Sequence, residues 1–503
     1  MHYWTVKSNQ VRGHAPTRLP AASRGAGTGV VLVILSVSAV SYALVQSMVN
    51  PGLETLRGQV HTNQLGVTWV LTSFLLASAV MTPIVGRLGD QVGKRRTLVA
   101  VLLFLTVGSV VAALATSLPM LVVGRLLQGA GGATLPLAFG IIRDLMPKAE
   151  VGAKVGMIAA VSAVGGAIGV LVAGPIIDGL GVPWLFWVPA IANGIMALAV
   201  LLFVPDIRAT STGRMNWPAG LMLAATLVLL LLPLSLGQEW GWNSARTVGL
   251  FAASLVAGVG WVAIETRSKF PLIDMRVFRL RPVWTANLVS FLFGVTLYSA
   301  FGFIPSFLQI PTDTGYGLGE SITAAGLLFL PVAATQFLSG LAAGPLARRV
   351  PTKVLLVGGT VPTVVSFLLL VPFHGTAWQV ALATAIGGVG FGIGLSALSA
   401  VVVHAVPAEH TGAATGMNAN IRTIGGAVGA AVVGTILASR TTSEGFPSEG
   451  GYTAVFALLA VTAAVGLVSC LLIPTNKAGT NQHEAQVAVD QRISELVDQH
   501  NPY

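Results

Sequence analysis

Long apolar stretches separated by short polar segments make up most of the chain after residue 27. Each stretch has about 18–24 residues, the length that an α-helix needs to cross the hydrocarbon core of a bilayer. Segments of about ten residues with alternating polarity, which a membrane β-barrel would need, are absent. The predicted fold class is therefore an all-α integral membrane protein with about 14 transmembrane helices. The pattern places them near residues 28–49, 66–86, 97–116, 119–142, 155–178, 184–204, 217–237, 247–265, 283–308, 321–344, 353–373, 377–403, 412–438 and 451–473.

The composition agrees with a membrane protein and excludes several other classes. Charged residues make up 9% of the 503 residues and hydrophobic residues 54%, whereas a soluble domain has about 25% charged residues. The single cysteine, Cys470, excludes an internal disulfide and a zinc site built on cysteine spacing. The net charge is +10, but the cations lie in short loops without a nucleic-acid-binding signature, so we expect no nucleic-acid partner.

Lys and Arg lie mainly in alternate loops. If the N-terminus is inside, the outer loops hold only Arg57, Arg246 and Arg440. Because Lys and Arg accumulate on the cytoplasmic side, this asymmetry predicts a multi-pass protein of the cell membrane with both termini in the cytoplasm. The first apolar run is too long for a signal-peptide core, so we expect it to remain as the first span.

The chain also contains a weak internal repeat. The segment GRLGDQVGKRRTLVAVL at 86–102 is answered by GPLARRVPTKVLLVGG at 344–359. Two similar halves related by an axis along the membrane normal would place one such segment in each half. The family resemblance described next implies the domains: a cytoplasmic segment 1–27, a six-helix bundle 28–204, two additional helices with linkers 205–282, a second six-helix bundle 283–473 and a cytoplasmic tail 474–503.

Several short motifs resemble those of one transporter family. GRLGDQVGKRR resembles the motif between spans 2 and 3 of the major facilitator superfamily, GRLLQGAGG the span 4 motif of its proton-coupled members, and AGPIIDG its span 5 antiporter motif. GQEWGW and PLIDMRVFR resemble features of its fourteen-span drug:proton antiporters, the quaternary-ammonium and multidrug exporters. The resemblance covers about residues 28–473 and implies the major facilitator fold, with two six-helix bundles and two extra central helices.

Two positions depart from the family pattern. Members of this branch often carry an acid in span 1, where this sequence has Tyr42 and no acid at all. In span 5 the first glycine of a usual pair is replaced by Asp178. The proton chemistry of better-known members therefore does not transfer directly to this chain.

The polar segment after the second span is the candidate inner gate, a contact that closes the cytoplasmic side. Topology alone would explain its cations, but the acid and the glycines need another reason. Glycines permit a close backbone approach, and the Asp90 carboxylate could bind the positive end of a helix from the other half, such as the one near Lys353. A nucleotide-binding loop is excluded because the glycine spacing is one residue short and Arg95 replaces the required Ser or Thr. The gate candidates are Gly86, Arg87, Asp90, Gly93, Lys94 and Arg95.

Three residues are candidates for proton coupling: Asp178, Arg125 and Gln128. A cation within a span is costly and by default functional, and Gln128 lies on the same helical face as Arg125. The alternative is a structural tie between Arg125 and backbone carbonyls. Asp178 is the only acid that the pattern places in or at the edge of a span, where it could bind a proton on one side and release it on the other. The alternative is a carboxylate wetted by water or paired with a helix end.

Span 5 and several polar residues in other spans complete the candidate machinery. Gly169, Gly174 and Pro175 are candidates for a hinge, with tight helix packing as the alternative. The intramembrane polar residues could line a central substrate cavity or could form hydrogen bonds between helices. These cavity candidates are Tyr42, Gln46, Asn287, Gln336, Asn418 and Arg422.

The leading hypothesis is a proton-coupled exporter of hydrophobic or amphipathic small molecules, such as drugs or antibiotics, that works by alternating access. The alternative is a dedicated transporter of one endogenous metabolite or lipid; a scaffold or sensor without transport fits these motifs poorly. The sequence has no catalytic arrangement and no metal-ligand spacing. We therefore expect that the protein is not an enzyme and that it binds no metal and no cofactor. The expected partners are a small-molecule substrate, protons and the lipid bilayer, and we expect a monomer.

Overall fold

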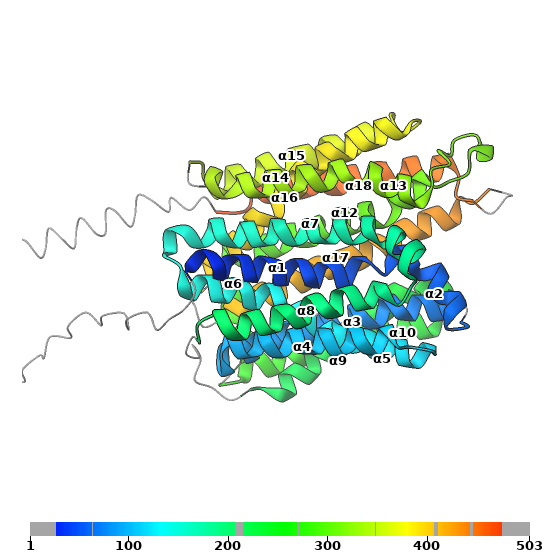
Figure 1. The fold of residues 1–503 in the computed structure, drawn as a ribbon. Coiled ribbons are helices and arrows are strands. Elements are labelled where there is room, and N and C mark those ends of the chain that lie inside the picture. Colours follow the sequence, from blue (N-terminus) through cyan, green and yellow to red (C-terminus); the bar gives the residue numbers. More distant parts are fainter. Residues whose placement is uncertain are drawn as a thin grey trace, which may run out of the picture.

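A computed structural model of the chain describes residues 27–474 except 63, 207–214, 270, 348, 407–410 and 443–445. Within these ranges the chain forms helices joined by short loops, with one isolated β-bridge between Thr441 and Pro447. The helices run side by side in one bundle (Figure 1), so the all-α membrane fold class is confirmed. The predicted segment 1–27 and tail 474–503 lie outside the described residues, apart from residues 27 and 474.

α1 begins and α18 ends at the same end of the bundle, on the left of Figure 1. We call this end the inner end, because the charge pattern predicts that it faces the cytoplasm. The first part of the chain forms α1 (Thr28–Ser47), η1 (Asn50–Gly52), α2 (Leu53–Gln59), α3 (Gln64–Val92), α4 (Lys94–Ala113), α5 (Leu118–Gln128), η2 (Gly129–Ala133), α6 (Thr134–Leu145), α7 (Lys148–Leu180) and α8 (Trp184–Phe203).

The two additional helices predicted between the halves are α9 (Trp217–Trp240) and α10 (Ala245–Arg267). They are followed by α11 (Met275–Phe278), α12 (Arg281–Leu308), η3 (Thr312–Thr314), α13 (Ile322–Leu328), α14 (Leu330–Ala347), α15 (Thr352–Leu370), α16 (Ala377–Ala405), α17 (Thr411–Ser439) and α18 (Glu449–Cys470).

Thirteen helical segments of the described chain are long and apolar enough to cross a membrane. The predicted continuous span at 119–142 is wrong in one respect, because α5, η2 and α6 replace it in sequence. The interruption falls on the glycine-rich run GAGGA, and glycine is a poor residue for an α-helix interior. These glycines also let the backbone approach α3, since a Cβ on Gly129 would lie 2.8 Å from the Ser78 nitrogen. Together the three pieces supply the fourteenth span.

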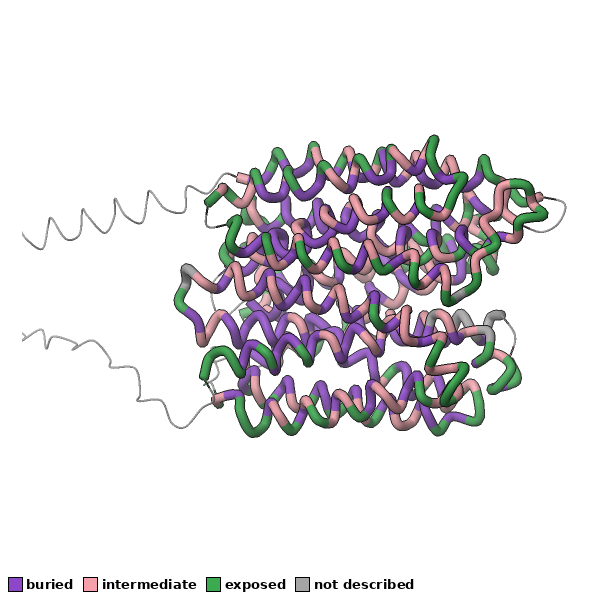
Figure 2. The backbone as a smooth tube through the Cα atoms, turned by 45° about the horizontal axis from the view of Figure 1, so that its top comes forward, coloured by how far each residue is buried: buried purple, intermediate pink, exposed green. Residues whose placement is uncertain are grey.

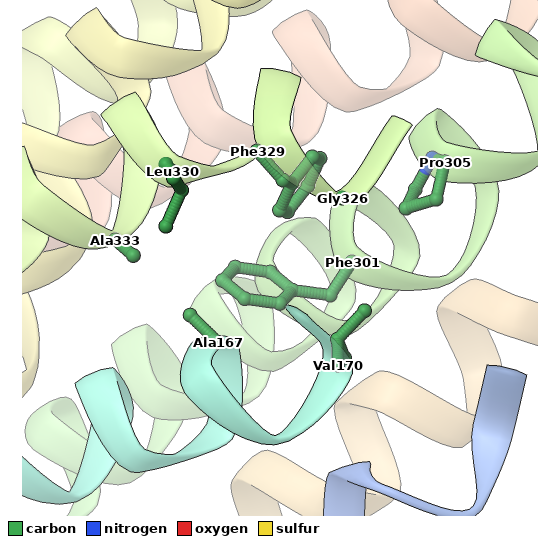
Figure 3. Close-up of a pocket in the computed structure, with 8 residues that line it drawn as sticks. All are labelled: Ala167, Val170, Phe301, Pro305, Gly326, Phe329, Leu330 and Ala333. Carbon is green, nitrogen blue, oxygen red and sulfur yellow. The ribbon is translucent and has the colours of Figure 1, made fainter. Parts of the chain in front are cut away.

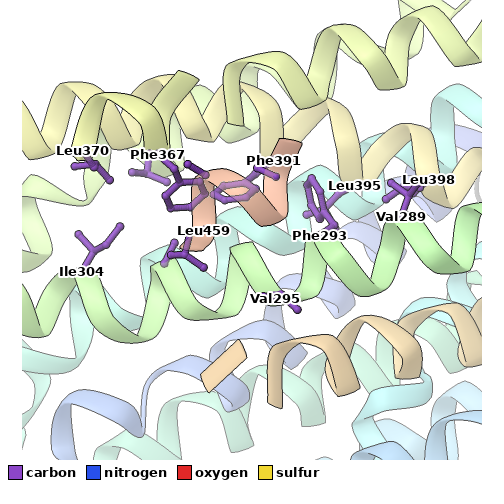
Figure 4. Packing of buried hydrophobic residues seen from close by; sticks show 14 of the residues in the cluster. Val289, Phe293, Val295, Ile304, Phe367, Leu370, Phe391, Leu395, Leu398 and Leu459 are labelled. Carbon is purple, nitrogen blue, oxygen red and sulfur yellow. The ribbon is translucent and has the colours of Figure 1, made fainter. Parts of the chain in front are cut away.

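Residues facing the interior of the bundle are buried, and those facing outward are exposed along most helices (Figure 2). In the second half the core is built on aromatic residues from α12, α15 and α16 (Figure 4). Phe293 and Phe391 pack edge to face with ring centroids 5.4 Å apart. Elsewhere glycines bring backbones together, as α4 and α5 do at Gly108 and Gly124. Packing of this kind is how helices associate where lipid removes the hydrophobic driving force.

The two halves meet along two seams. On one seam α3 packs against α17, and on the other α7 packs against α14 and α16. The α9–α10 pair covers the first seam, because α9 contacts both α3 and α17. A buried cluster joins these elements and includes Ala79 of α3, Leu227 of α9 and Met417 of α17.

The α4–α5 contact gives a test of the packing. A Cβ on Gly124 would lie 2.8 Å from both the Ala112 nitrogen and the Gly108 oxygen, so Gly124→Ala forces two backbones apart. Overpacking of this kind costs about 1–3 kcal/mol. We expect Gly124→Ala to lower the melting temperature of the detergent-solubilised protein, as measured by loss of monodispersity on heating. Gly358→Ala is the matched control, since nothing lies within 4 Å of its Cβ position; equal melting temperatures for both variants would contradict the packing described here.

Candidate functional site

A cavity of about 270 Å³ lies between the two halves. Small-molecule sites usually begin at about 300 Å³, so the volume suits a compact ligand. α1, α3, η2, α6 and α7 contribute one wall, and α12, α14, α16 and α17 contribute the other. Its apolar lining comes mainly from Leu75, Phe139, Leu297, Phe301, Leu395 and Val402. Its polar lining is Tyr42, Gln46, Ser47, Ser78, Thr82, Ser162, Tyr298, Gln336, Ser399, Thr415, Asn418, Asn420, Arg422 and Thr423.

Five of the six cavity candidates named from the sequence line this cavity: Tyr42, Gln46, Gln336, Asn418 and Arg422. The sixth, Asn287 on α12, lies behind the lining. Its Oδ1 accepts a hydrogen bond of 2.8 Å from Nδ2 of Asn418, which also lies 2.9 Å from the Ser290 hydroxyl. Asn287 therefore holds a lining side chain in place instead of facing the cavity.

Tyr42 lines the cavity from α1, and a glycine makes room for its ring. A Cβ on Gly131 would lie 2.7 Å from the ring carbon Cδ2. The hydroxyl is 3.3 Å from the Ser78 hydroxyl on α3. Tyr42 thus presents a neutral polar group to the cavity and is held against α3.

Arg125 makes no contact with the cavity and instead joins three helices. Its side chain is 1% exposed. Nε donates to the Val70 carbonyl of α3 at 3.1 Å, and Nη1 donates to the Val45 carbonyl of α1 at 3.2 Å. The guanidinium also lies 4.4 Å from the centre of the Phe74 ring. These contacts are the tie to backbone carbonyls that the sequence left open as an alternative.

Gln128 extends this network to a fourth helix. Its Oε1 accepts a 2.8 Å hydrogen bond from Arg125, and its Nε2 donates at 2.8 Å to Ser109 of α4. Gln128 itself is fully buried. The network therefore links α1, α3, α4 and α5 through hydrogen bonds.

Asp178 lies elsewhere. It is an exposed residue in the last turn of α7, at the outer end, and does not line the cavity. Its position matches the wetted carboxylate that the sequence left open as an alternative. Between the proton-coupling candidates, the geometry favours Arg125 and Gln128 over Asp178.

The inner-gate candidates gather where α3 meets the start of α17. A Cβ on Gly86 would lie 2.9 Å from the Gly412 carbonyl oxygen, so the two backbones are nearly in contact. Asp90 is fully buried, and its carboxylate faces Gly412, where an added Cβ would lie 3.0 Å from Oδ2. A carboxylate is stabilised at the positive N-terminal end of a helix. From the sequence, the helix near Lys353, which is α15, is one example of the expected partner. In the structure the helix that faces Asp90 is α17, and Lys353 donates to the Leu471 carbonyl instead.

The cations of the same segment have distinct partners. Lys94 lies 2.6 Å from Asp144 of α6 and 3.6 Å from Asp90. Arg87 is buried and interacts electrostatically with Asp90 and with Glu265 of α10. Arg95 donates to the Leu201 carbonyl of α8. The buried charges at the inner end thus lie near groups of opposite sign, while both Asp90 carboxylate oxygens are without a hydrogen-bond partner among the described residues.

Gly93 makes the turn in this segment possible. It is the single residue between α3 and α4, and its φ of 115° lies in the left-handed region that favours glycine. The turn sets the start of α4 beside the end of α3, which brings Lys94 back onto Asp90.

Arg143 joins the two halves at the inner end and is not among the gate candidates named from the sequence. Its guanidinium, at the end of α6, donates to the carbonyls of Val403 at 2.7 Å and Val406 at 2.6 Å. It also donates to the Thr411 hydroxyl. All three acceptors belong to the second half, so Arg143 joins the two halves at the inner end. We call these three hydrogen bonds the Arg143 clasp. A cation at the end of a span is too common a feature to have revealed this contact.

The second seam is closed at the same end by small residues. The Ser396 hydroxyl of α16 donates to the Gly156 carbonyl of α7 at 2.9 Å. A Cβ on Gly344 of α14 would lie 3.0 Å from the Ala153 Cβ. Both seams thus hold contacts between the two halves in their inner parts.

The hinge candidates lie on α7, which continues through Pro175 to Leu180. Gly169 packs against Ser47 and Met48 of α1, and Gly174 faces Thr323 at 3.7 Å. Helix packing, the alternative considered for these glycines, is therefore present in this state; a hinge remains a proposal.

A second, smaller cleft lies beside the cavity between α7, α12 and the α13–α14 junction (Figure 3). Its volume is about 10 Å³, room for about one water molecule. Phe301 and Val170 line both spaces, and Phe301 points between α7 and α14 in Figure 3. The cleft is too small for a substrate. Among the described residues no group of His, Cys, Asp and Glu could hold a metal ion.

Comparison with known proteins agrees with this architecture. A family model described as Major Facilitator Superfamily matches residues 35–430 and, in a second match, 310–498. Multidrug resistance protein 3 of Bacillus subtilis is 27% identical over 373 residues, which cover 73% of this chain and 72% of that protein. The lincomycin resistance protein of Streptomyces lincolnensis is 29% identical over 90% of this chain and 92% of its own length. The cephamycin export protein CmcT of Amycolatopsis lactamdurans is 31% identical over 87% and 90%.

Solved structures share the fold at low sequence identity. The human organic anion transporter MFSD10 superposes with a TM-score of 0.64 at 16% identity, covering 88% of this chain and 99% of that one. The proton:xylose symporter XylE also gives 0.64, at 13% identity, covering 89% and 96%. At this identity the likeness concerns the fold alone.

The Arg143 clasp can be tested by the accessibility of the cavity from the inner end. In a Cys470→Ala background, a cysteine placed at Ser399 lines the cavity behind the clasp. Removing a charged hydrogen-bond donor costs about 1.5–3 kcal/mol, so Arg143→Ala should raise maleimide labelling from the inner side of everted vesicles about ten-fold or more. Arg96→Ala is the control, because Arg96 pairs with Asp206 within the same half. Labelling that stays at the control level would show that Arg143 does not hold the inner end closed.

Proposed function

The chain belongs to the Major Facilitator Superfamily and is a membrane transporter, not an enzyme, and from this we propose that it is a proton-coupled exporter of hydrophobic or amphipathic small molecules. The observation that carries the proposal is the central cavity lined by both halves, with Arg143 and the Gly86–Gly412 approach joining the halves toward the inner end. Such a site becomes accessible to one side and then the other when two halves rock about it.

The names of the relatives support drugs or antibiotics as the cargo. The relatives include a multidrug resistance protein, a lincomycin resistance protein and a cephamycin export protein. A cavity that combines aromatic, aliphatic and neutral polar lining residues suits amphipathic molecules of this kind. A dedicated exporter of one endogenous compound is the second candidate, because some of these relatives are named for a single compound.

We place the coupling in the buried network of Arg125 and Gln128. A guanidinium stays protonated, so Arg125 acts through its field and its hydrogen bonds and does not itself carry the proton. The network is placed to transmit a change at the cavity to helix packing, because it binds α1 and α3, which both line the cavity. Protons moving inward down their gradient would then drive the cargo outward.

The same proposal includes the arrangement in the membrane. Both termini lie in the cytoplasm, the inner end of the bundle faces the cytoplasm, and the protein works as a monomer. The division into bundles 28–204 and 283–473, with α9 and α10 between them, follows the two seams across which the halves would move.

Transport in proteoliposomes with an imposed pH gradient tests the coupling, using a panel of chemically diverse amphipathic compounds. We expect gradient-driven uptake into inverted vesicles by the wild type. Arg125→Lys keeps the charge but cannot reproduce the fork of hydrogen bonds, so it should lose gradient-driven uptake while retaining substrate counterflow, which needs no gradient. Asp178→Asn should retain both activities, because Asp178 is exposed and lies outside the cavity.

Arg246→Gln is the matched control, since Arg246 lies outside the cavity and stacks on Trp240. Uptake by the wild type that is independent of the gradient would remove the proton-coupled proposal. If Arg125→Lys loses both counterflow and uptake, Arg125 has a structural role only. If Asp178→Asn loses gradient-driven uptake, the Asp178 carboxylate takes part in proton coupling.

A further inference from the structure

The charge of the central cavity is unusual for a site that moves amphipathic compounds. Of the described residues that line it, Arg422 on α17 is the one that carries a formal charge, and none is an acid. The cavity therefore has a net positive charge in a low-dielectric surrounding. A cationic ligand placed there would meet repulsion with no carboxylate to offset it.

Arg422 is also without a partner of its own. Within the described residues its guanidinium has neither a hydrogen bond nor an ion pair, unlike Arg125, which is bound by Val45, Val70 and Gln128. An arginine inside a membrane domain is costly unless it is paired or marks a pathway. The five N–H donors of Arg422 are thus available to a ligand in the cavity.

The residues around Arg422 add neutral polar groups and apolar surface. Asn418 lies one helical turn earlier on α17 and is held by Asn287, so it does not fold onto the guanidinium. Tyr42 of α1 lines the same cavity with a neutral hydroxyl. Phe139 and Phe301 supply aromatic surface on the walls of the same cavity.

We propose that the cargo of this cavity is an amphipathic monoanion, with its carboxylate or similar oxyanion paired to Arg422 and its apolar body against the aromatic walls. The inference rests on the proposed export function and adds the charge class of the substrate. Arg is suited to this role because its planar fork binds an oxyanion through two hydrogen bonds.

The charge class changes how transport is driven. A membrane potential that is negative inside pushes an anion outward, and 100 mV supports about a 50-fold concentration ratio for a monoanion. Export of an anion therefore draws on the potential as well as on the pH gradient, without any carboxylate in the cavity. This fits a cavity whose span 1 position carries Tyr42 in place of the acid.

Binding to the purified full-length protein in detergent tests the proposal without any gradient. The probes share one fluorescent group: dansylglycine is the monoanion, dansylglycinamide the neutral analogue and N-dansylethylenediamine the cation. Energy transfer from tryptophan to the dansyl group reports binding. We expect dansylglycine to bind at least ten-fold more tightly than either analogue, the gain of a charge-assisted hydrogen-bonded pair.

Variants assign that preference to one side chain. Arg422→Gln should weaken dansylglycine binding about ten- to hundred-fold and change the neutral analogue less than two-fold. Arg422→Lys should fall between them, because Lys keeps the charge without the fork. Arg246→Gln, an arginine outside the cavity, should match the wild type. Unchanged binding of the neutral analogue shows that the variant is folded.

Tighter binding of the neutral or cationic probe, equal binding of all three, or binding of none overturns the monoanion proposal. So does an Arg422→Gln variant that loses the anionic and neutral probes equally. These outcomes are distinct from failure of the export proposal, which would show as absence of gradient-driven transport of every compound in a panel whatever the order of binding.

Discussion

The close approach of α3 and α17 at Gly86 and Gly412 is the contact on which the state of this molecule depends. Two helix backbones can come this near only where neither residue has a side chain. With the backbones together, the Asp90 carboxylate reaches the start of α17. The same closure brings Arg143 onto the carbonyls at the end of α16. In this structure all of these contacts therefore lie together at the inner end and join the two halves.

The inner end and the cavity differ in the charged groups that they contain. At the inner end buried acids and bases lie together: Lys94 touches Asp90 and Asp144, and Arg87 interacts with Asp90 and Glu265. These groups place opposite charges close together at the inner end. In the cavity Arg422 has no hydrogen bond and no ion pair among the described residues. A charge inside a membrane domain is costly unless it is paired or marks a pathway, which is the basis for the ligand proposed for Arg422.

The membrane spans could be predicted from sequence because the thickness of the bilayer fixes their length. The 3-10 segment within span 4 was not predicted. It falls on the glycines of GAGGA, where α3 packs against them, and hydropathy does not depend on which helix packs nearby. The cavity candidates were predictable as polar residues in spans. Arg422 faces the cavity, whereas Asn287 supports Asn418, which lines it; this difference depends on the rotation of each helix about its axis, which the sequence does not give. The motif after the second span identified Asp90 as a gate candidate. Only the packing of the two halves shows that the helix facing Asp90 is α17.

The α9–α10 pair has a consequence for the movement of the halves. The cluster under it contains Ala79 from one half and Met417 from the other, with Leu227 of α9 packed against both helices. The Glu265 carboxylate of α10 binds the backbone nitrogens of Leu272 and Ile273, which belong to the same cluster. Hydrogen bonds to a charged group are stronger than apolar contacts between helices. These hydrogen bonds fix the segment after α10 to α10. Any separation of α3 from α17 at this seam would expose part of the apolar cluster that α9 covers.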